Sequence, residues 1–151
     1  WRNKSTTAAA ALTSETIRPA MDAMYLSLCR GADKPDLIVA GDKLYTLYEQ
    51  SLTNLQRFTD PKMAESGFAA LKYKGADVIF DGGQGGNCPE DKMYFLNSEY
   101  IYLRPHKDRD MKVIGGERMS VNQDAIYKII GWAGNMTMSN AALQGVLING
   151  K

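Results

Sequence analysis

The sequence predicts an α+β fold in which two helices pack on a mixed, largely antiparallel sheet. Two amphipathic helical patterns lie before residue 60, and the rest of the chain is rich in short strand patterns separated by glycine, proline and polar residues. The predicted order is helix, strand, helix and then about five strands, without an internal repeat. We expect residues 1–12 to be an extended leading segment and residues 13–151 to form one domain.

The first helix is expected to begin at Thr13 or Thr16 and to end at Gly31. Its apolar side chains recur every three or four residues and form one stripe: Ile17, Ala20, Met21, Met24, Tyr25 and Leu28. With Thr16 as the N-cap, Pro19 falls in the first turn, where its missing N–H group costs no hydrogen bond. Glycine suits the left-handed conformation that often ends a helix.

A short buried strand from Leu37 to Ala40 precedes the second helix. Asp42 is its expected N-cap, and Asp60-Pro61 is its expected stop, so the helix should end near Thr59. Its apolar face consists of Leu44, Leu47, Tyr48, Ser51, Leu52, Leu55 and Phe58. Residues 61–67 are expected to form a loop.

The remaining segments read as strands and turns. In chain order we expect strands within residues 68–75, 76–83, 92–97 and 100–105, an exposed loop or loose hairpin arm at 105–118, a strand-rich tract at 118–139 and a closing strand at 142–150. Gly75 suits a tight connection between the first two of these strands. In the tract at 118–139, apolar residues occupy both sides of the alternation, so we expect both faces to be at least partly covered.

Composition narrows the class of protein. Eighteen lysines and arginines oppose seventeen aspartates and glutamates, which gives a formal net charge of +1; an electrostatic nucleic-acid binder normally carries a basic stripe instead. Apolar runs such as residues 36–41 are too short to span a bilayer, and the first twelve residues lack the apolar core of a signal peptide. Cys29 and Cys88 are too few for a disulfide framework, so we expect free thiols and a reducing compartment.

The segment "DGGQGGNCPEDK" at residues 81–92 raises the question of a phosphate-binding loop, because glycines that follow a strand often cradle phosphate. A dinucleotide-binding loop that starts at Gly83 requires glycine at position 88, where this chain has cysteine. A Walker loop must end in Gly-Lys-Ser or Gly-Lys-Thr, and this segment does not. A flexible hairpin connection without a ligand is therefore favoured over a nucleotide-binding loop at Gly82–Gly86.

No pattern predicts a catalytic or metal site. His106 is the only histidine, it lies in the charged run "RPHKDRD", and no nucleophile motif accompanies it, so we expect a solvated surface side chain. One histidine and two distant cysteines do not match the spacing of a zinc site. The alternating charges of "HKDRD" are better suited to ion pairs between subunits. We nominate no catalytic, cofactor-binding or metal-ligating residue, and no cofactor.

The large side chains point to assembly. Tyr94, Phe95, Tyr100, Tyr102, Tyr127 and Trp132 gather in the strand-rich half, and most of them are expected in the core. Strands this apolar in so small a chain should leave apolar surface uncovered, which is typical of an assembly interface. The residues therefore favour a structural or interaction protein over an enzyme.

Three blocks resemble the C-terminal half of the major capsid protein of tailed bacteriophages and prophages. They are "CRGADKPDLIVAGDKLYTLYEQSLTNLQRFTD", "LKYKGADVIFDGGQGGNCPEDKMYFLNSEYIYLRPHKD" and "SVNQDAIYKIIGWAGNMTMSNAALQGVLI", in the order found in that family. The resemblance covers residues 13–148. It implies the HK97-like capsid fold, and this chain looks like its axial domain.

The family also has a long spine helix and an extended β-loop, and we expect neither in this chain. The abrupt start at Trp1 suggests a fragment of a longer polypeptide. Loops Gly82–Asn87 and Arg104–Arg118 become candidates for contacts with neighbouring subunits.

The resemblance implies an icosahedral shell that forms in the bacterial host cytoplasm and becomes the virion capsid. Its partners would be further copies in pentamers and hexamers, scaffold and portal proteins, and packaged double-stranded DNA held without sequence-specific contacts, with no role for a membrane. The alternatives are an encapsulin-type compartment protein, a tail or head-completion protein that forms a fixed ring, and a small nucleotide-binding enzyme that uses the Gly82–Gly86 loop.

Overall fold

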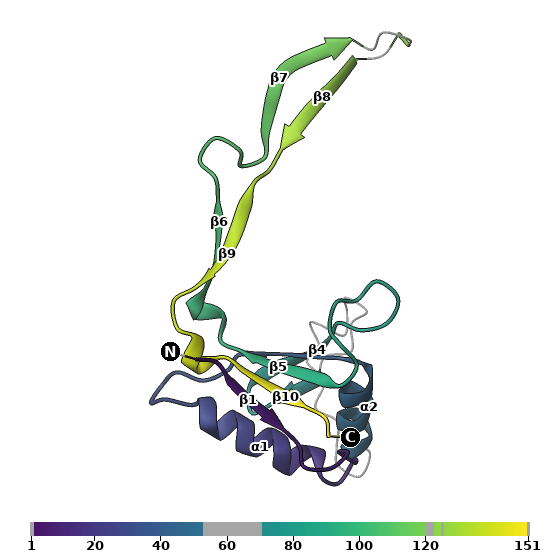
Figure 1. Cartoon of the computed structure of the whole chain (residues 1–151), viewed down its shortest axis with the longest axis vertical. Helices are drawn as coiled ribbons and strands as arrows, with labels where there is room; N and C mark the ends of the chain where they lie inside the picture. The colour runs from purple at the N-terminus through teal and green to yellow at the C-terminus, as the bar shows by residue number, and fades with distance from the viewer. Residues whose placement is uncertain (1, 53–70, 120–122, 125, 151) are drawn as a thin grey trace. The chain divides into compact units, whose positions relative to one another are not determined.

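The chain folds into two compact units, which Figure 1 shows in a computed structural model. The first unit, called the body, comprises Trp1–Glu99 and Asn140–Lys151; the second, called the arm, comprises Tyr100–Ser139. The structure describes residues 2–52, 71–119, 123–124 and 126–150. The first junction lies within the short 3₁₀ helix Ser98–Tyr100, and the second lies between Ser139 and Asn140.

The body is built on a six-stranded mixed sheet with the order β1-β10-β5-β2-β4-β3. Its strands are β1 (Lys4–Thr7), β2 (Leu37–Ala40), β3 (Leu71–Tyr73), β4 (Ala76–Phe80), β5 (Lys92–Leu96) and β10 (Gly145–Ile148). The β1–β10 and β2–β4 pairs are parallel, and the other three pairs are antiparallel. The α+β class with two helices and a mixed sheet is thus confirmed.

Helix α1 (Ile17–Leu28) follows the predicted apolar stripe, whose buried members are Ile17, Met21, Met24, Tyr25 and Leu28. Thr16 is the N-cap, and Pro19 lies in the first turn, as expected. The helix ends at Cys29, which has an extended backbone, and Gly31 then takes a left-handed φ of 64°. The three-residue and four-residue spacing identified this helix correctly because one side of it faces the core.

Helix α2 (Asp42–Ser51) begins where predicted but is capped differently. Gly41 is its N-cap, Asp42 is its first helical residue, and the Asp42 carboxylate makes no cap hydrogen bond. The prediction of Asp42 as the N-cap was therefore wrong, because this side chain is bound by a distant loop instead. The predicted end near Thr59 and the loop at 61–67 lie outside the described residues.

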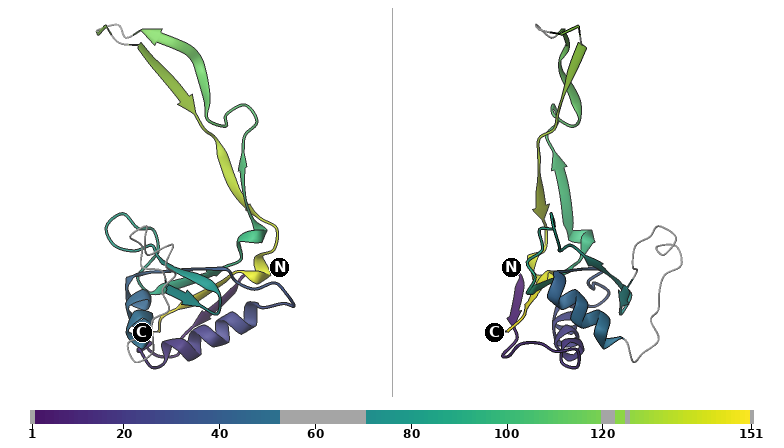
Figure 2. Two further views of the ribbon diagram at one scale, coloured as in Figure 1. Left: turned by 180° about the vertical axis from the view of Figure 1, so that it is seen from behind. Right: turned by 90° about the vertical axis from the view of Figure 1, so that its right-hand side faces the viewer.

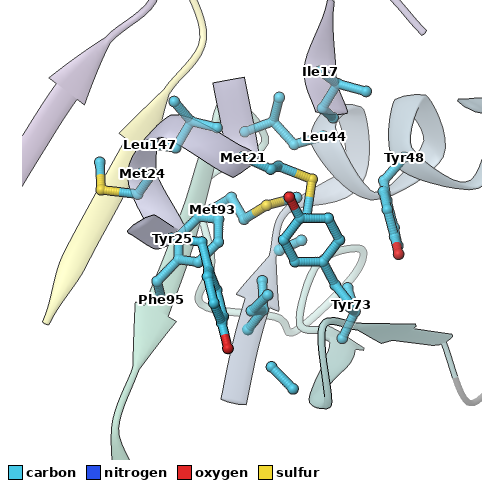
Figure 3. Packing of buried hydrophobic residues seen from close by; sticks show 14 of the residues in the cluster. Ile17, Met21, Met24, Tyr25, Leu44, Tyr48, Tyr73, Met93, Phe95 and Leu147 are labelled. Atoms are coloured by element: carbon cyan, nitrogen blue, oxygen red, sulfur yellow. The ribbon is translucent and has the colours of Figure 1, made fainter. Parts of the chain in front are cut away.

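Both helices cover the same face of the sheet. Alternate strand residues that are buried, such as Ile38, Val78 and Phe95, belong to one cluster with Met21 and Leu44 from the helices. Figure 3 shows Met21, Leu44 and Phe95 together with the tyrosines of the helices and of β3. Apart from Lys92, the intervening residues of β2, β5 and β10 are also apolar or aromatic but only half-buried. The sheet therefore has one fully covered face, and this face holds the core.

Strands β3 and β4 form the tight hairpin predicted at Gly75. Lys74 and Gly75 both have positive φ angles, 50° and 88°, which is the geometry of a two-residue turn that matches strand twist. The connection from β4 to β5 was predicted as a hairpin, and this was wrong. Strand β2 lies between β4 and β5, so residues 81–91 cross the end of β2.

The leading segment contains a strand that its sequence did not predict. Residues 1–12 were expected to be extended, and Lys4–Thr7 do form β1, the edge strand that pairs in parallel with β10. All four residues of β1 are exposed. Residues 1–12 are polar and alanine-rich and show no alternation of apolar and polar side chains. Only the pairing with β10 therefore identifies β1 as a strand.

The arm consists of two consecutive two-stranded antiparallel ladders (Figure 2). Strand β6 (Ile101–Pro105) pairs with β9 (Gly134–Met138), and β7 (Lys112–Met119) pairs with β8 (Ile126–Gly131). The hairpin-arm alternative for residues 105–118 is confirmed.

A buried amide pair lies next to the junction of the two units, on the body side. The backbone N–H of Asn97 donates to Gln144 Oε1 at 2.9 Å, and Gln144 Nε2 donates to the carbonyl oxygen of Asn97 at 3.0 Å. Both residues are about as buried as the core. They immediately flank the short 3₁₀ helices Ser98–Tyr100 and Ala141–Leu143, so the chain leaves and re-enters the body at adjacent points.

Replacement of Phe95 by alanine should destabilise the body. Phe95 is completely buried in the cluster between the sheet and the helices, so the change removes a large apolar side chain and leaves a cavity. We expect a loss of about 3–5 kcal/mol in the free energy of unfolding, measured by urea denaturation. Leu26→Ala, at an exposed position of α1, should change it by less than about 0.5 kcal/mol; equal losses would contradict the assigned core.

Replacement of Gln144 by alanine should cost more than its small apolar area suggests. The change leaves the N–H and the carbonyl group of Asn97 buried without partners, and each such group costs about 1–3 kcal/mol. Chemical denaturation measures the loss, with Gln50→Ala on the exposed side of α2 as control. Two indistinguishable unfolding midpoints would show that Asn97 finds other partners.

Candidate functional site

Exposed apolar side chains are concentrated in the arm. Within the described residues, twelve of the fourteen large hydrophobic side chains that are exposed belong to it, and only Leu26 and Phe80 belong to the body. The twelve are Tyr102, Leu103, Met111, Val113, Met119, Ile126, Tyr127, Ile129, Ile130, Trp132, Met136 and Met138. Soluble monomers rarely gather so many on one element, so the arm is the candidate functional site.

The ladder of β6 and β9 is amphipathic. On one face, the Arg104 Nε atom donates to Thr137 Oγ1 at 2.9 Å, and the guanidinium lies 5.7 Å from the centre of the Tyr102 ring. On the other face, Leu103 lies directly opposite Met136, and Ile101 lies opposite Met138. Leu103 and Met136 are 61% and 65% exposed. The ladder therefore has one polar face with its own contacts and one apolar face.

The ladder of β7 and β8 is apolar on both faces. On one face, the ion pair Lys128–Glu117, at 2.7 Å, is flanked by the cross-strand pairs Met119–Ile126 and Val113–Ile130. On the other face, Ile114 lies opposite Ile129 and packs over Gly131, where an added Cβ would come within 2.2 Å of Ile114 Cδ1. Gly115 and Gly116, both with positive φ, form the bulge that shifts the register between these pairs.

These contacts correct two predictions from the sequence. The tract at 118–139 was expected to be covered on both faces, yet every residue of β8 except half-buried Gly131 is exposed. Most of the clustered aromatic side chains were expected in the core, yet only Phe95 is buried there. Alternation identifies a strand, but it does not show whether a second layer covers it. The general expectation of uncovered apolar surface is confirmed.

The elbow of the arm joins its two ladders. We define it as residues 106–111 of one strand connection together with Trp132 and Ala133 of the other. The backbone N–H of His106 donates to the Ala133 carbonyl at 2.7 Å, and the N–H of Ala133 donates to the Arg109 carbonyl at 2.9 Å. Met111 has a φ of 49°, unusual for a residue with a side chain, and is 69% exposed.

The glycine loop, residues 81–91, lies against the start of α2. The N–H of Gly83 donates to the Asp42 Oδ1 atom at 2.9 Å, and a Cβ at Gly82 would collide with the same carboxylate. Further backbone bonds, Cys88 N–H to Asp81 and Lys92 N–H to Pro89, close the loop. The loop amide of Gly83 is thus bound by a carboxylate in the first turn of α2, and the negative charge of this carboxylate would repel a phosphate, which argues against nucleotide binding here.

The other residues considered for chemistry are scattered. His106 is exposed in the arm, where its Nδ1 atom accepts the N–H of Asp108 at 3.2 Å. Cys88 is half-buried in the body, and burial, with the Asp81 and Asp42 carboxylates, raises the pKa of its thiol, so the thiolate is disfavoured. Cys29 is also a free thiol. No group of three or more histidine, cysteine, aspartate or glutamate side chains with metal-binding geometry exists among the described residues.

A tyrosine cluster in the body carries the strongest electrostatic perturbation. The Tyr73 hydroxyl donates to the Asp22 carboxylate, which also pairs with the Lys74 ammonium. The Tyr73 ring packs edge-on against Tyr25 and Tyr48, with centroids 5.9 and 6.0 Å away. Burial, then Asp22, raises the pKa of Tyr73. These contacts join α1 to the β3–β4 hairpin, so we assign them a structural role.

Asp22 should make the stability of the body depend on pH. Hydrogen bonds from Lys74 and then from Tyr73 lower the pKa of its carboxyl below the ordinary value of 3.8. Because the folded-state pKa is the lower one, the contribution of Asp22 is present above pH 3.8 and is lost as the pH falls through the folded-state pKa. The difference in free energy of unfolding between the native chain and Asp22→Asn should shrink as the solution is acidified. A difference that is constant with pH would contradict this role.

The residues that form the apolar face of β6 and β9 were missed by motif reasoning. Their signal is the alternation in "IYLRP" and "NMTM", where every second side chain is apolar. No helix among the described residues is long and apolar enough to cross a membrane. No protein-family model matches the sequence, and no curated protein matches it either.

Proposed function

We propose that this protein is a structural subunit that assembles with copies of itself into a closed shell, as the major capsid protein of a tailed bacteriophage does. The observation that carries the proposal is the arm, which gathers nearly all the exposed large hydrophobic side chains of the described chain. The body, in contrast, buries its apolar stripe and presents few such side chains to solvent.

The arm has the character of an element that is stabilised by a partner. A two-stranded ladder is marginal in water, because its side chains cover too little apolar area and both edges keep unpaired backbone groups. The β7–β8 ladder has apolar side chains on both faces, so no orientation of it hides them all. Packing against other subunits supplies the missing layers.

The energetics permit such an interface. Full burial of a large aliphatic side chain stabilises by about 1.5–3 kcal/mol. The apolar side chains of the arm are about half exposed, so covering them all would stabilise the assembly by on the order of 10 kcal/mol. Association costs about 4–15 kcal/mol. The two figures are comparable, so assembly requires that most of the arm is covered at once, which favours many cooperative contacts.

The resemblance to the HK97-like capsid family supports the proposal that the assembly is a closed shell. The α+β body agrees with an axial-type domain, and its near-zero net charge suits dense packing of identical subunits. Further partners under this proposal are scaffold and portal proteins and packaged double-stranded DNA. The site of action is the virion capsid, after assembly in the host cytoplasm, and the protein is not an enzyme. An encapsulin-type compartment protein would share the HK97-like fold, and its gene neighbours would be cargo enzymes instead of portal and terminase genes.

Removal of apolar side chains from the arm should abolish assembly and leave the body folded. Leu103 and Met136 lie opposite each other on the apolar face of β6 and β9, so Leu103→Ser with Met136→Ser makes that face polar. We expect the unsubstituted full-length gene product to form closed shells or capsomer rings in electron microscopy. The double variant should associate at least roughly tenfold more weakly, with an unchanged melting temperature of the body.

Leu26→Ser is the matched control, because Leu26 is as exposed as Met136 but lies on α1 in the body. It should assemble normally. A full-length product that stays monomeric at high concentration would contradict the proposed function. Equal assembly of the double variant and the native protein would contradict the role of the arm.

A further inference from the structure

The body contains a groove of about 640 Å³ beside α2. Its apolar wall includes Leu12 and Leu47, and Thr46 is exposed along it. Asp42, Lys43 and Asp91 form its polar wall. The groove is open, and its volume suits two or three large side chains. It does not overlap the arm, so it is a second surface with a different shape.

The rim of this groove is acidic. The Lys43 ammonium pairs with Asp91 at 3.1 Å and with Glu90 at 3.7 Å, and Asp42 lies beside them. Two carboxylates therefore contact one ammonium, and the Asp42 carboxylate adds a third negative charge to the wall of the groove. The side chains of Lys43, Glu90 and Asp91 are all about half exposed or more, so the excess negative charge faces solvent. A partner that fits this rim carries positive charge around an apolar tip.

The elbow has these properties when its flanking residues Arg104 and Lys112 are included. Residues 104–112 contain four basic side chains, Arg104, Lys107, Arg109 and Lys112, against two acidic ones, Asp108 and Asp110. All of these residues are exposed. Among the described residues, neither Lys107 nor Arg109 takes part in an ion pair. Met111 and Trp132, which are 69% and 46% exposed, supply the apolar tip.

We propose that the elbow of one copy seats in the groove of a second copy, with Met111 and Trp132 against Leu12 and Leu47 and with Arg109 near Glu90. The contact deepens the proposed function and rests on it, because it joins two different surfaces of the same chain. Such heterologous contacts propagate from copy to copy and close into rings. A contact between residues 104–112 of two copies would instead bring together two segments with more basic than acidic side chains, which like-charge repulsion disfavours.

Disulfide capture tests the contact directly. Met111→Cys and Thr46→Cys are made in separate chains whose Cys29 and Cys88 are replaced by alanine, because both native cysteines are free thiols. The two proteins are mixed under assembly conditions and mildly oxidised, and linked dimers are quantified by non-reducing electrophoresis. We expect several-fold more dimer from this mixture than from Met111→Cys mixed with Leu26→Cys, whose exposed site lies on α1.

The alternative outcomes separate the two proposals. Self-linked dimers of Met111→Cys alone would overturn the inference in favour of elbow-to-elbow contact. An internal disulfide in monomers of a further chain that carries both Met111→Cys and Thr46→Cys, without linked dimers, would also overturn it, because the elbow would then occupy the groove of its own copy. Shells that form without mixed disulfides would overturn the inference and leave the proposed function standing. Absence of both shells and disulfides would overturn both.

Charge reversal provides an independent readout. Arg109→Glu and Glu90→Arg should each weaken association by about two- to fivefold, since an exposed ion pair contributes a modest free energy. The chain that carries both substitutions should recover, because every copy then presents the reversed pair. Light scattering at low and high salt measures the association. Additive losses without recovery would overturn the pairing of these two side chains.

Discussion

The buried pair of Asn97 and Gln144 is the constraint on which both units depend. Its two reciprocal hydrogen bonds satisfy a backbone N–H, a backbone carbonyl and a side-chain amide in the interior, where each would be costly alone. Asn97 follows β5, where the chain passes into the arm, and Gln144 precedes β10, where the chain returns to the body. Holding these two points side by side sets the register of β5 with β10 in the body. It also brings together the chain ends from which β6 and β9 begin to pair.

The body buries its large apolar side chains, whereas the arm leaves most of them exposed. In the body, two amphipathic helices cover one face of a mixed sheet, and a tyrosine cluster with Asp22 and Lys74 ties α1 to the edge hairpin. In the arm, two ladders of two strands each carry apolar side chains with no covering layer among the described residues. Under the proposed function, the apolar arm is the element that assembly would cover. In the proposed contact, the groove beside α2 of a second copy would receive the elbow of this arm.

The conformation of the glycine loop depends on Asp42, a residue far from the loop in the sequence. Read from the sequence, its glycine spacing already failed the templates for phosphate binding. The fold adds a positive reason, because the Asp42 carboxylate holds the loop amide of Gly83 at the start of α2. That same bond explains why Asp42 does not cap its own helix. The positive φ angles of Gly83 and Gly85 serve a connection that crosses the end of β2, and the sequence could not distinguish this from a hairpin.

The sequence by itself determined the secondary structure wherever one side of an element faces the core. The stripe of α1, the strand before α2, the turn at Lys74-Gly75 and the closing strand β10 all follow from periodicity or from glycine, because these local signals report burial on one face or a positive φ angle. Only the tertiary structure decided which strands pair, since β1 joins β10 and β2 separates β4 from β5 through contacts between residues far apart in sequence. It also decided which apolar strands are covered. The alternation in β8 is the same whether a second layer lies on it or not, so the exposure of the arm, and with it the candidate site, could not be derived from the sequence alone.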